Sequence, residues 1–290
     1  MNIKTSRAVW ANFLLLVVAI VWGGGFVAGK AALGGLSPVA VLFYRFLLSA
    51  LAVGVIFWRS IRGFNMRELR YGCLLGVLLF LGLVIQLAAL QYTTVAKQSF
   101  IAAAYVIFTP LLSWLIFRDR PAAAELTAAF MVLGGVALIS LNGDLSIQTG
   151  DFMTLGFTLI FALQLIIIAR FTGGLSAVNM TFFQIVTACI LAAAAVVLLD
   201  IPIVITGSVC MLSVGYLAFI NTAVAMLLQN YAQKYTKENH AALILALESV
   251  FGFIFAVIIF DDPVTPRMLW GCLLIMLGVL LAKLRPAGGK

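Results

Sequence analysis

The sequence has little charge, one histidine and four cysteines, and these shortages exclude several kinds of protein. Only 10% of its 290 residues are charged, whereas 64% are hydrophobic. This balance excludes a soluble globular domain and a disordered chain, and it predicts an all-α polytopic membrane protein. Cys73, Cys189, Cys210 and Cys272 stand singly in apolar stretches, and His240 is the only histidine. We therefore expect no disulfide framework, no metal site and no cofactor.

Ten apolar segments follow one another with short connections. Twenty helical residues rise about 30 Å, the thickness of a bilayer's hydrocarbon core. The predicted spans are approximately Val9–Leu33, Pro38–Trp58, Tyr71–Gln91, Gln98–Phe117, Leu126–Leu141, Asp151–Ala169, Val178–Leu199, Val209–Gln233, Ala241–Phe260 and Met268–Leu284. The sequence therefore predicts ten transmembrane helices with no soluble domain between them.

The basic residues flank these spans and predict the topology. The net charge of +8 is typical of nucleic-acid binders, but here the charges form no patch, so we expect no nucleic-acid partner. With the N-terminus in the cytoplasm, three basic residues lie at outer ends (Lys30, Lys97 and Arg267) and fourteen at inner ends: Lys4, Arg7, Arg59, Arg62, Arg67, Arg70, Arg118, Arg120, Arg170, Lys234, Lys237, Lys283, Arg285 and Lys290. This positive-inside bias places both termini in the cytoplasm. We expect an integral protein of a plasma membrane, such as a bacterial inner membrane.

An internal repeat appears when the chain is aligned with itself at a shift of 143 residues. The identical pairs include Gly72 with Gly215, Gln86 with Gln229, Tyr92-Thr93 with Tyr235-Thr236, Phe108 with Phe251, Phe117 with Phe260, Asp119 with Asp262 and Gly135-Val136 with Gly278-Val279. Each half, 1–143 and 144–290, contains five predicted spans. Because five is odd, the second half crosses the membrane in the opposite sense. Inverted repeats are typical of secondary transporters, whose substrate site forms near the bilayer midplane between the repeats.

Two glycine motifs lie inside predicted spans. Residues Gly24 to Lys30 fit most of a phosphate-binding loop, but Ala31 stands where that loop needs Ser or Thr. We expect these glycines to allow close helix packing or local unwinding beside a cavity. Gly72 and Gly76 form a GxxxG motif, which predicts a tight contact with another helix.

The sequence resembles the EamA family of the drug/metabolite transporter superfamily along nearly its whole length. The resemblance rests on Trp22-Gly-Gly-Gly-Phe26 with Lys30, Ser37-Pro38 with Arg45-Phe46, Leu90-Gln-Tyr-Thr-Thr94 with Ser99-Phe-Ile101, Thr109-Pro110, Arg118-Asp-Arg-Pro121, and Ala241-Ala-Leu through Leu247-Glu248. Ser249 stands where the family often has Pro, and Asp119 and Asp262 stand where it usually has Glu. The resemblance implies two five-helix repeats and transport of small metabolites, often export of amino acids.

Glu248 lies near the middle of the predicted span Ala241–Phe260, where an acidic residue costs about 2.5–3.5 kcal/mol on insertion scales. One interpretation is a role in substrate binding or coupling, and the other is a buried structural carboxylate bonded to a neighbouring helix. At the shift of 143 its repeat mate is Tyr105. Trp22, Gln164 and Asn221 fall at similar depth. These aromatics, amides and carboxylate would suit a small zwitterion or an organic cation.

Arg45 lies seven residues into the second span, ~10 Å below the outer surface. It either snorkels or pairs with a neighbouring helix, or it anchors a substrate carboxylate through its planar fork. The predicted substrate-binding residues are Trp22, Arg45, Tyr105, Gln164, Asn221 and Glu248, with Glu248 as the coupling residue.

The sequence favours a secondary transporter, with a small-molecule substrate and the bilayer as partners. We expect an exporter of a small polar metabolite such as an amino acid, working by alternating access and driven by the substrate gradient or by protons. The alternative is a lipid-carrier flippase, or a nucleotide-sugar or other metabolite facilitator of the same fold. The sequence also leaves open whether the protein forms a homodimer. An enzyme would need clustered catalytic residues, and a channel would need a filter loop or rings of like charge.

The predicted topology can be tested by labelling single cysteines introduced into a cysteine-free variant. Residues 61–67 and 118–123 are expected to be cytoplasmic, and residues 142–148 and 200–207 to face outward. An impermeant thiol reagent added outside should label a cysteine at Ser146 but not one at Arg62. The reverse pattern would overturn the orientation.

Overall fold

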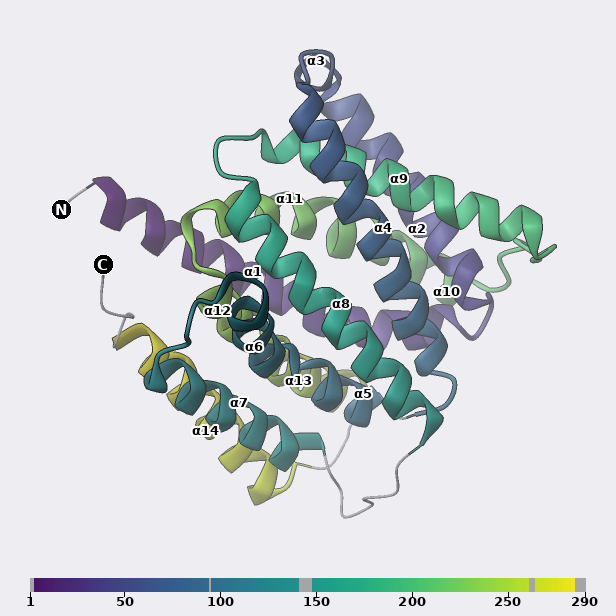
Figure 1. Cartoon of the computed structure of the whole chain (residues 1–290). Helices are drawn as coiled ribbons and strands as arrows, with labels where there is room; N and C mark the ends of the chain where they lie inside the picture. The colour runs from purple at the N-terminus through teal and green to yellow at the C-terminus, as the bar shows by residue number, and fades with distance from the viewer. Residues whose placement is uncertain (1–2, 94, 141–147, 261–263, 285–290) are drawn as a thin grey trace.

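The chain folds into a bundle of helices, shown in Figure 1. The computed structural model describes residues 3–93, 95–140, 148–260 and 264–284, and every regular element within them is helical. In chain order the elements are α1 (Ile3–Ala32), α2 (Pro38–Ile56), α3 (Trp58–Ile61), α4 (Met66–Ala89), α5 (Val95–Ala102), α6 (Tyr105–Phe117), α7 (Ala123–Ser140), α8 (Thr149–Phe171), α9 (Ala177–Leu198), α10 (Ser208–Tyr216), η1 (Leu217–Val224), α11 (Ala225–Ala232), η2 (Gln233–Tyr235), α12 (Glu238–Leu245), α13 (Glu248–Phe260) and α14 (Pro266–Leu284).

Seven helical segments are long and apolar enough to cross a membrane, and three more are apolar but shorter. The seven are Arg7–Ala32, Pro38–Ile56, Met66–Ala89, Thr149–Phe171, Ala177–Leu198, Ser208–Tyr235 and Glu238–Phe255, and the shorter three are Tyr105–Phe117, Ala123–Leu138 and Pro266–Leu281. The chain is thus an integral membrane protein, whereas the count of ten spans and the side of the termini remain predictions. Asp262, Arg285, Lys290, residues 142–147 and the boundary between the predicted halves lie outside the described residues, as do the side chains of Lys4, Lys97 and Lys283.

Two spans predicted as single helices, Gln98–Phe117 and Ala241–Phe260, are each broken near the middle. The backbone tightens at both points. Leu247 N–H donates to Ile244 O and Ser249 N–H to Ala246 O, at 3.1 and 3.2 Å. The same two bonds, from Ala104 to Ile101 and from Val106 to Ala103, occur 143 residues earlier, both at 3.1 Å. A bond to the third preceding residue replaces the bond to the fourth, so each helix ends and a new one begins at Tyr105 or Glu248.

The predicted span Val209–Gln233 also departs from a regular α-helix. Its middle, η1, is π-helical, and a short 3₁₀ turn, η2, follows α11. A π-helical segment changes the direction in which side chains leave the helix, and such segments are frequent at functional sites. Asn221 and Thr222, which are buried, lie in η1.

The glycine motifs allow close helix packing. A Cβ added at Gly76 of α4 would lie 2.5 Å from Gln184 O and 2.6 Å from Thr187 Cβ on α9, so the predicted tight contact is confirmed. At Gly23 an added Cβ would lie 2.7 Å from Gly252 N and 2.9 Å from Glu248 O. Helix α1 is continuous there, so of the two roles expected for this motif the structure shows close packing rather than unwinding.

Helix α1 packs against both parts of the broken ninth predicted span, which are α12 and α13. It also packs against the eighth predicted span, which comprises α10, η1, α11 and η2. Helix α1 contacts α10, η1, α11, α12 and α13, while α4 packs between α8 and α9. Figure 1 shows α7 and α14 side by side at one edge of the bundle, in agreement with their extensive contact. The bundle centre is therefore formed by α1, α2, α4, α8 and the eighth and ninth spans.

Replacement of Gly76 by Ala should destabilise the protein, because the new methyl group meets the backbone of α9. We expect a loss of about 1–3 kcal/mol, the usual cost of overpacking, seen as a lower unfolding temperature in detergent. Gly156 on α8 is the matched control, because an added Cβ there meets nothing within 4 Å. Equal unfolding temperatures for the two variants would show that the α4–α9 contact is not tight.

Candidate functional site

A cavity lies between α1, α2, α4, α8 and the eighth and ninth spans. It holds about 650 Å³ of space free of protein atoms, its open side included. Its lining is mostly apolar with a few polar groups, as in small-molecule sites. The lining residues are Trp22, Gly25, Phe26, Arg45, Leu79, Leu83, Gln86, Leu87, Leu90, Gln98, Phe161, Asn221, Met226 and Glu248.

Arg45 reaches the cavity from α2 and is held by the eighth span. Its Nε donates to Thr222 Oγ1 at 2.5 Å, and its Nη2 donates to Asn221 Oδ1 at 2.8 Å. Only 7% of Arg45 is exposed. Both acceptors are neutral, so their hydrogen bonds orient the guanidinium without cancelling its charge.

Asn221 in turn is fixed by α1. Its Nδ2 donates to Val21 O at 3.0 Å, and Trp22 Nε1 donates to Asn221 O at 3.1 Å. An added Cβ at Gly25 would collide with the Asn221 side chain, so this glycine makes room for it. The tryptophan, the amide and the guanidinium therefore form one connected network that spans α1, η1 and α2.

Glu248 begins α13, immediately after the break in the ninth span. It is 6% exposed and lines the cavity. Tyr105 OH, at the start of α6, donates to Glu248 Oε1 at 3.4 Å, a long hydrogen bond. The first turn of a helix favours a negative charge. The two chain breaks thus bring together the residue predicted for coupling and its repeat mate.

Arg45 and Glu248 face the same cavity, yet neither has an ion-pair partner within 4.0 Å among the described residues. Breaking a buried pair by removing one charge costs about 3–5 kcal/mol in proteins, because a lone buried charge is poorly solvated. Two such charges in one cavity are unusual in a structure built for stability alone. They give the cavity one positive and one negative group.

Trp22 and Phe161 form an aromatic wall of the cavity, and Tyr105 packs behind it. The rings of Trp22 and Phe161 meet edge to face with centroids 5.5 Å apart, and those of Tyr105 and Phe161 do so at 4.9 Å. Aromatic faces attract cations. The wall therefore suits an apolar side chain or an ammonium group near Glu248.

The six residues predicted for the site do not all reach the cavity. Trp22, Arg45, Asn221 and Glu248 line it, whereas Tyr105 is fully buried behind Glu248. Gln164 is 1% exposed, does not line the cavity, and its Nε2 finds no partner among the described residues.

Sequence reasoning missed several lining residues. Gln86 and Gln98 add amides, and Gln98 Nε2 donates to Gln86 O at 2.6 Å. Phe26, Phe161 and Met226 add apolar surface. Gln86 could have been identified from the sequence, because it is identical to its repeat mate Gln229. No sequence feature marks the apolar lining residues, since such residues occur throughout membrane helices.

Comparison with known proteins places the chain among transporters. It is 31% identical over 279 residues to an uncharacterised transporter of Archaeoglobus fulgidus, covering 96% of this chain and 87% of that one. It is 24% identical to the uncharacterised transporter YyaM of Bacillus subtilis, covering 93% and 92% of the two chains. A solved crystal structure with 18% identity superposes with a TM-score of 0.78 over 94% of this chain and 96% of that one, which shows a shared fold.

The sequence profile of the EamA-like transporter family matches twice, over residues 9–141 and 148–284. Together these matches cover nearly the whole chain and agree with the resemblance in the sequence motifs. The protein belongs to the EamA-like transporter family.

Proposed function

We propose that this protein is a secondary transporter that exports a small zwitterionic metabolite, an amino acid being the simplest such compound. The observation that carries this proposal is the pair of unpaired charges, Arg45 and Glu248, in one cavity. A zwitterion placed between them supplies each with an opposite charge. Its carboxylate accepts from the guanidinium of Arg45, and its ammonium group approaches Glu248 and the aromatic wall. Export is the direction that the family resemblance implies.

Transport proceeds by alternating access, with the cytoplasm at the end that carries the arginine-rich connections. The broken ninth span supports this mechanism, since discontinuous helices form the sites of many secondary transporters. Glu248 lies at the break, where a small rotation of α12 against α13 changes its surroundings. A proton and the substrate ammonium group would then compete for the same carboxylate, which gives proton antiport.

The role of Arg45 is tested with matched ligands on purified protein. A stabilising ligand raises the unfolding temperature in proportion to its affinity, so amino acids are compared with their carboxamides, which lack the carboxylate. We expect the parent to prefer the amino acid. Replacement of Arg45 by Gln should weaken amino-acid binding roughly 10- to 100-fold, the value of a lost charge-assisted hydrogen bond, and leave carboxamide binding nearly unchanged.

The more conservative Arg45→Lys variant separates a structural role from a binding role. If Arg45 only holds α2 against η1, this variant has a lower unfolding temperature but the parent's preference for the carboxylate. A variant that binds every ligand with the parent's affinity would remove Arg45 from the site.

Glu248→Gln tests proton coupling, because it keeps the shape of the side chain and removes its charge. In proteoliposomes the parent is expected to concentrate substrate under an imposed pH gradient. The Gln variant should lose that dependence and retain exchange down a substrate gradient. If the variant still concentrates substrate as the parent does, Glu248 is not the coupling residue.

Glu68→Gln serves as the control for this measurement. Glu68 is a second buried carboxylate, but it lies at the start of α4, accepts from Asn179 Nδ2 at 2.7 Å and from Ser176 N–H at 2.8 Å, and is not part of the cavity. Its replacement should lower the unfolding temperature and leave the response to the pH gradient intact.

A further inference from the structure

The cavity lies toward one end of the bundle, and Arg67, Arg70, Arg118, Arg170 and Lys234 lie at the other end, which we call the basic end. The lining residues on α4 and at its C-cap, Leu79 to Leu90, all lie in the half of that helix away from the basic end. The two ends of the bundle therefore differ although the two sequence halves are related.

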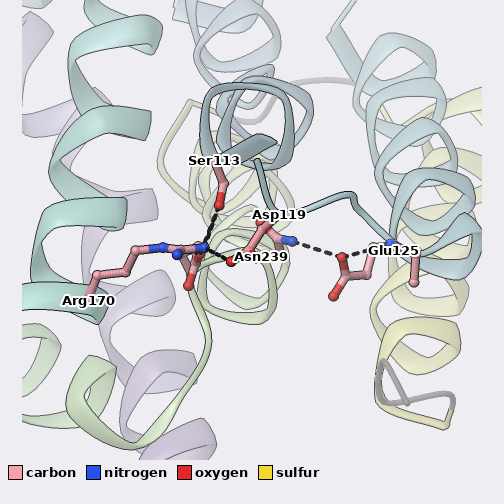
Figure 2. Close-up of polar contacts among 7 residues, drawn as sticks. Ser113, Asp119, Glu125, Arg170 and Asn239 are labelled. Atoms are coloured by element: carbon pink, nitrogen blue, oxygen red, sulfur yellow. Dashed lines mark hydrogen bonds and ion pairs between the residues drawn. The ribbon is translucent and has the colours of Figure 1, made fainter. Parts of the chain in front are cut away.

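A polar cluster ties several helices together at the basic end (Figure 2). Arg170, near the end of α8, donates to Glu238 Oε1 at 2.7 Å, to Asp119 Oδ2 at 2.5 Å and to Ser113 Oγ at 2.8 Å. Asn239 Nδ2 donates to Glu125 Oε2 at 2.8 Å.

The cluster joins the two sequence halves. Ser113 lies on α6 and Glu238 on α12, which are the basic-end parts of the two broken spans. Arg170 therefore holds both of these half-helices in place against α8.

The repeat relates the lining of the cavity to a buried face of the eighth span. At the shift of 143, the lining residues of α4 correspond to residues on η1, α11 and η2. The pairs are Leu79 with Thr222, Leu83 with Met226, Gln86 with Gln229, Leu87 with Asn230 and Leu90 with Gln233. Met226 also lines the cavity, whereas Gln229, Asn230 and Gln233, the mates nearest the basic end, do not.

The covered face is polar, and its amides are poorly satisfied. Gln229, Asn230 and Gln233 are completely buried. Both amide atoms of Gln229 and of Gln233, and Oδ1 of Asn230, find no hydrogen-bond partner among the described residues. Buried amides are ordinarily bonded, so such a concentration calls for an explanation. On α9, Gln184 faces them and accepts from Asn230 Nδ2 at 2.9 Å.

We propose that Gln229, Asn230 and Gln233 line a second, polar half-cavity that opens at the basic end when the Arg170 cluster separates. In that state the amides meet water and substrate, and the apolar face of α4 closes against its neighbours. The substrate path therefore continues from Asn221 and Thr222 along the eighth span. This inference rests on the proposed alternating access and adds the residues that form the path and its gate.

The test measures cysteine reactivity in protein reconstituted in nanodiscs, where a charged methanethiosulfonate reagent reaches both faces. In a variant without native cysteines, Gln86→Cys, at a half-buried lining position, reports the open cavity, and Gln233→Cys reports the covered amide face. Adding Arg170→Ala should raise the reaction rate of Gln233→Cys roughly tenfold, equivalent to about 1.4 kcal/mol, and lower that of Gln86→Cys. Adding Gln229→Leu, which removes an unpaired amide from the covered face, should raise the rate at Gln86→Cys.

Ile166→Cys on α8, a fully buried position outside the cavity lining, is the control and should stay unreactive throughout. Equal increases at all three positions would indicate general loosening and overturn the proposal. If Arg170→Ala does not yield folded protein, Gln229→Leu decides alone. A higher unfolding temperature with faster labelling of Gln86→Cys supports the gate, and an unchanged or lower temperature with unchanged labelling overturns it.

The labelling requires no substrate, so its outcome is separate from that of the proposed function. If the reactivities shift in opposite directions but no amino acid stabilises the protein, the gate is supported and the proposed substrate is rejected. Reactivities that do not shift while amino acids still stabilise the protein would reject the gate alone.

Discussion

The hydrogen bonds that Arg45 makes to Asn221 and Thr222 hold the centre of the molecule together. A guanidinium within a membrane span must be solvated by the protein, and here the π-helical turn η1 presents both acceptors to it. Because both are neutral, the charge remains available to a ligand. The same contact joins α2 to the eighth span and, through Trp22, to α1. The Arg45 side chain is therefore part of the contact that forms the cavity wall.

The sequence predicts the all-helical membrane class well, because membrane spans are long apolar runs, whereas the count of ten spans and the inverted repeat stay predictions. It also places Glu248 at the centre, since a carboxylate in such a run is conspicuous. The same reasoning finds Trp22, Arg45 and Asn221, which line the cavity with it. These residues were identifiable because polar or indole groups inside apolar spans need partners.

The sequence predicts the structure less well where local backbone geometry determines it. No proline marks the break before Glu248, and alanines precede it, so the span Ala241–Phe260 reads as one helix. The break comes from one tightened turn, with α1 packed closely on it at Gly23. Gln164 shows the related difficulty with side chains. Its depth matches that of the cavity, but depth does not specify which face of the helix carries it, and the structure buries it away from the lining.

The contact between Tyr105 and Glu248 shows how a nearly symmetric fold carries an asymmetric site. These residues are repeat mates, and they touch. Two positions exchanged by a two-fold axis can touch only if the axis passes between them, so Glu248 lies at the axis of the repeat. In the proposed alternating access, a group on the axis keeps its place while the halves rock, and it borders whichever half-cavity is open. Only one mate is acidic, and Ala188 is the mate of Arg45. In that proposal the symmetry provides two access routes, whereas the single pair of charges provides one binding site that both routes share.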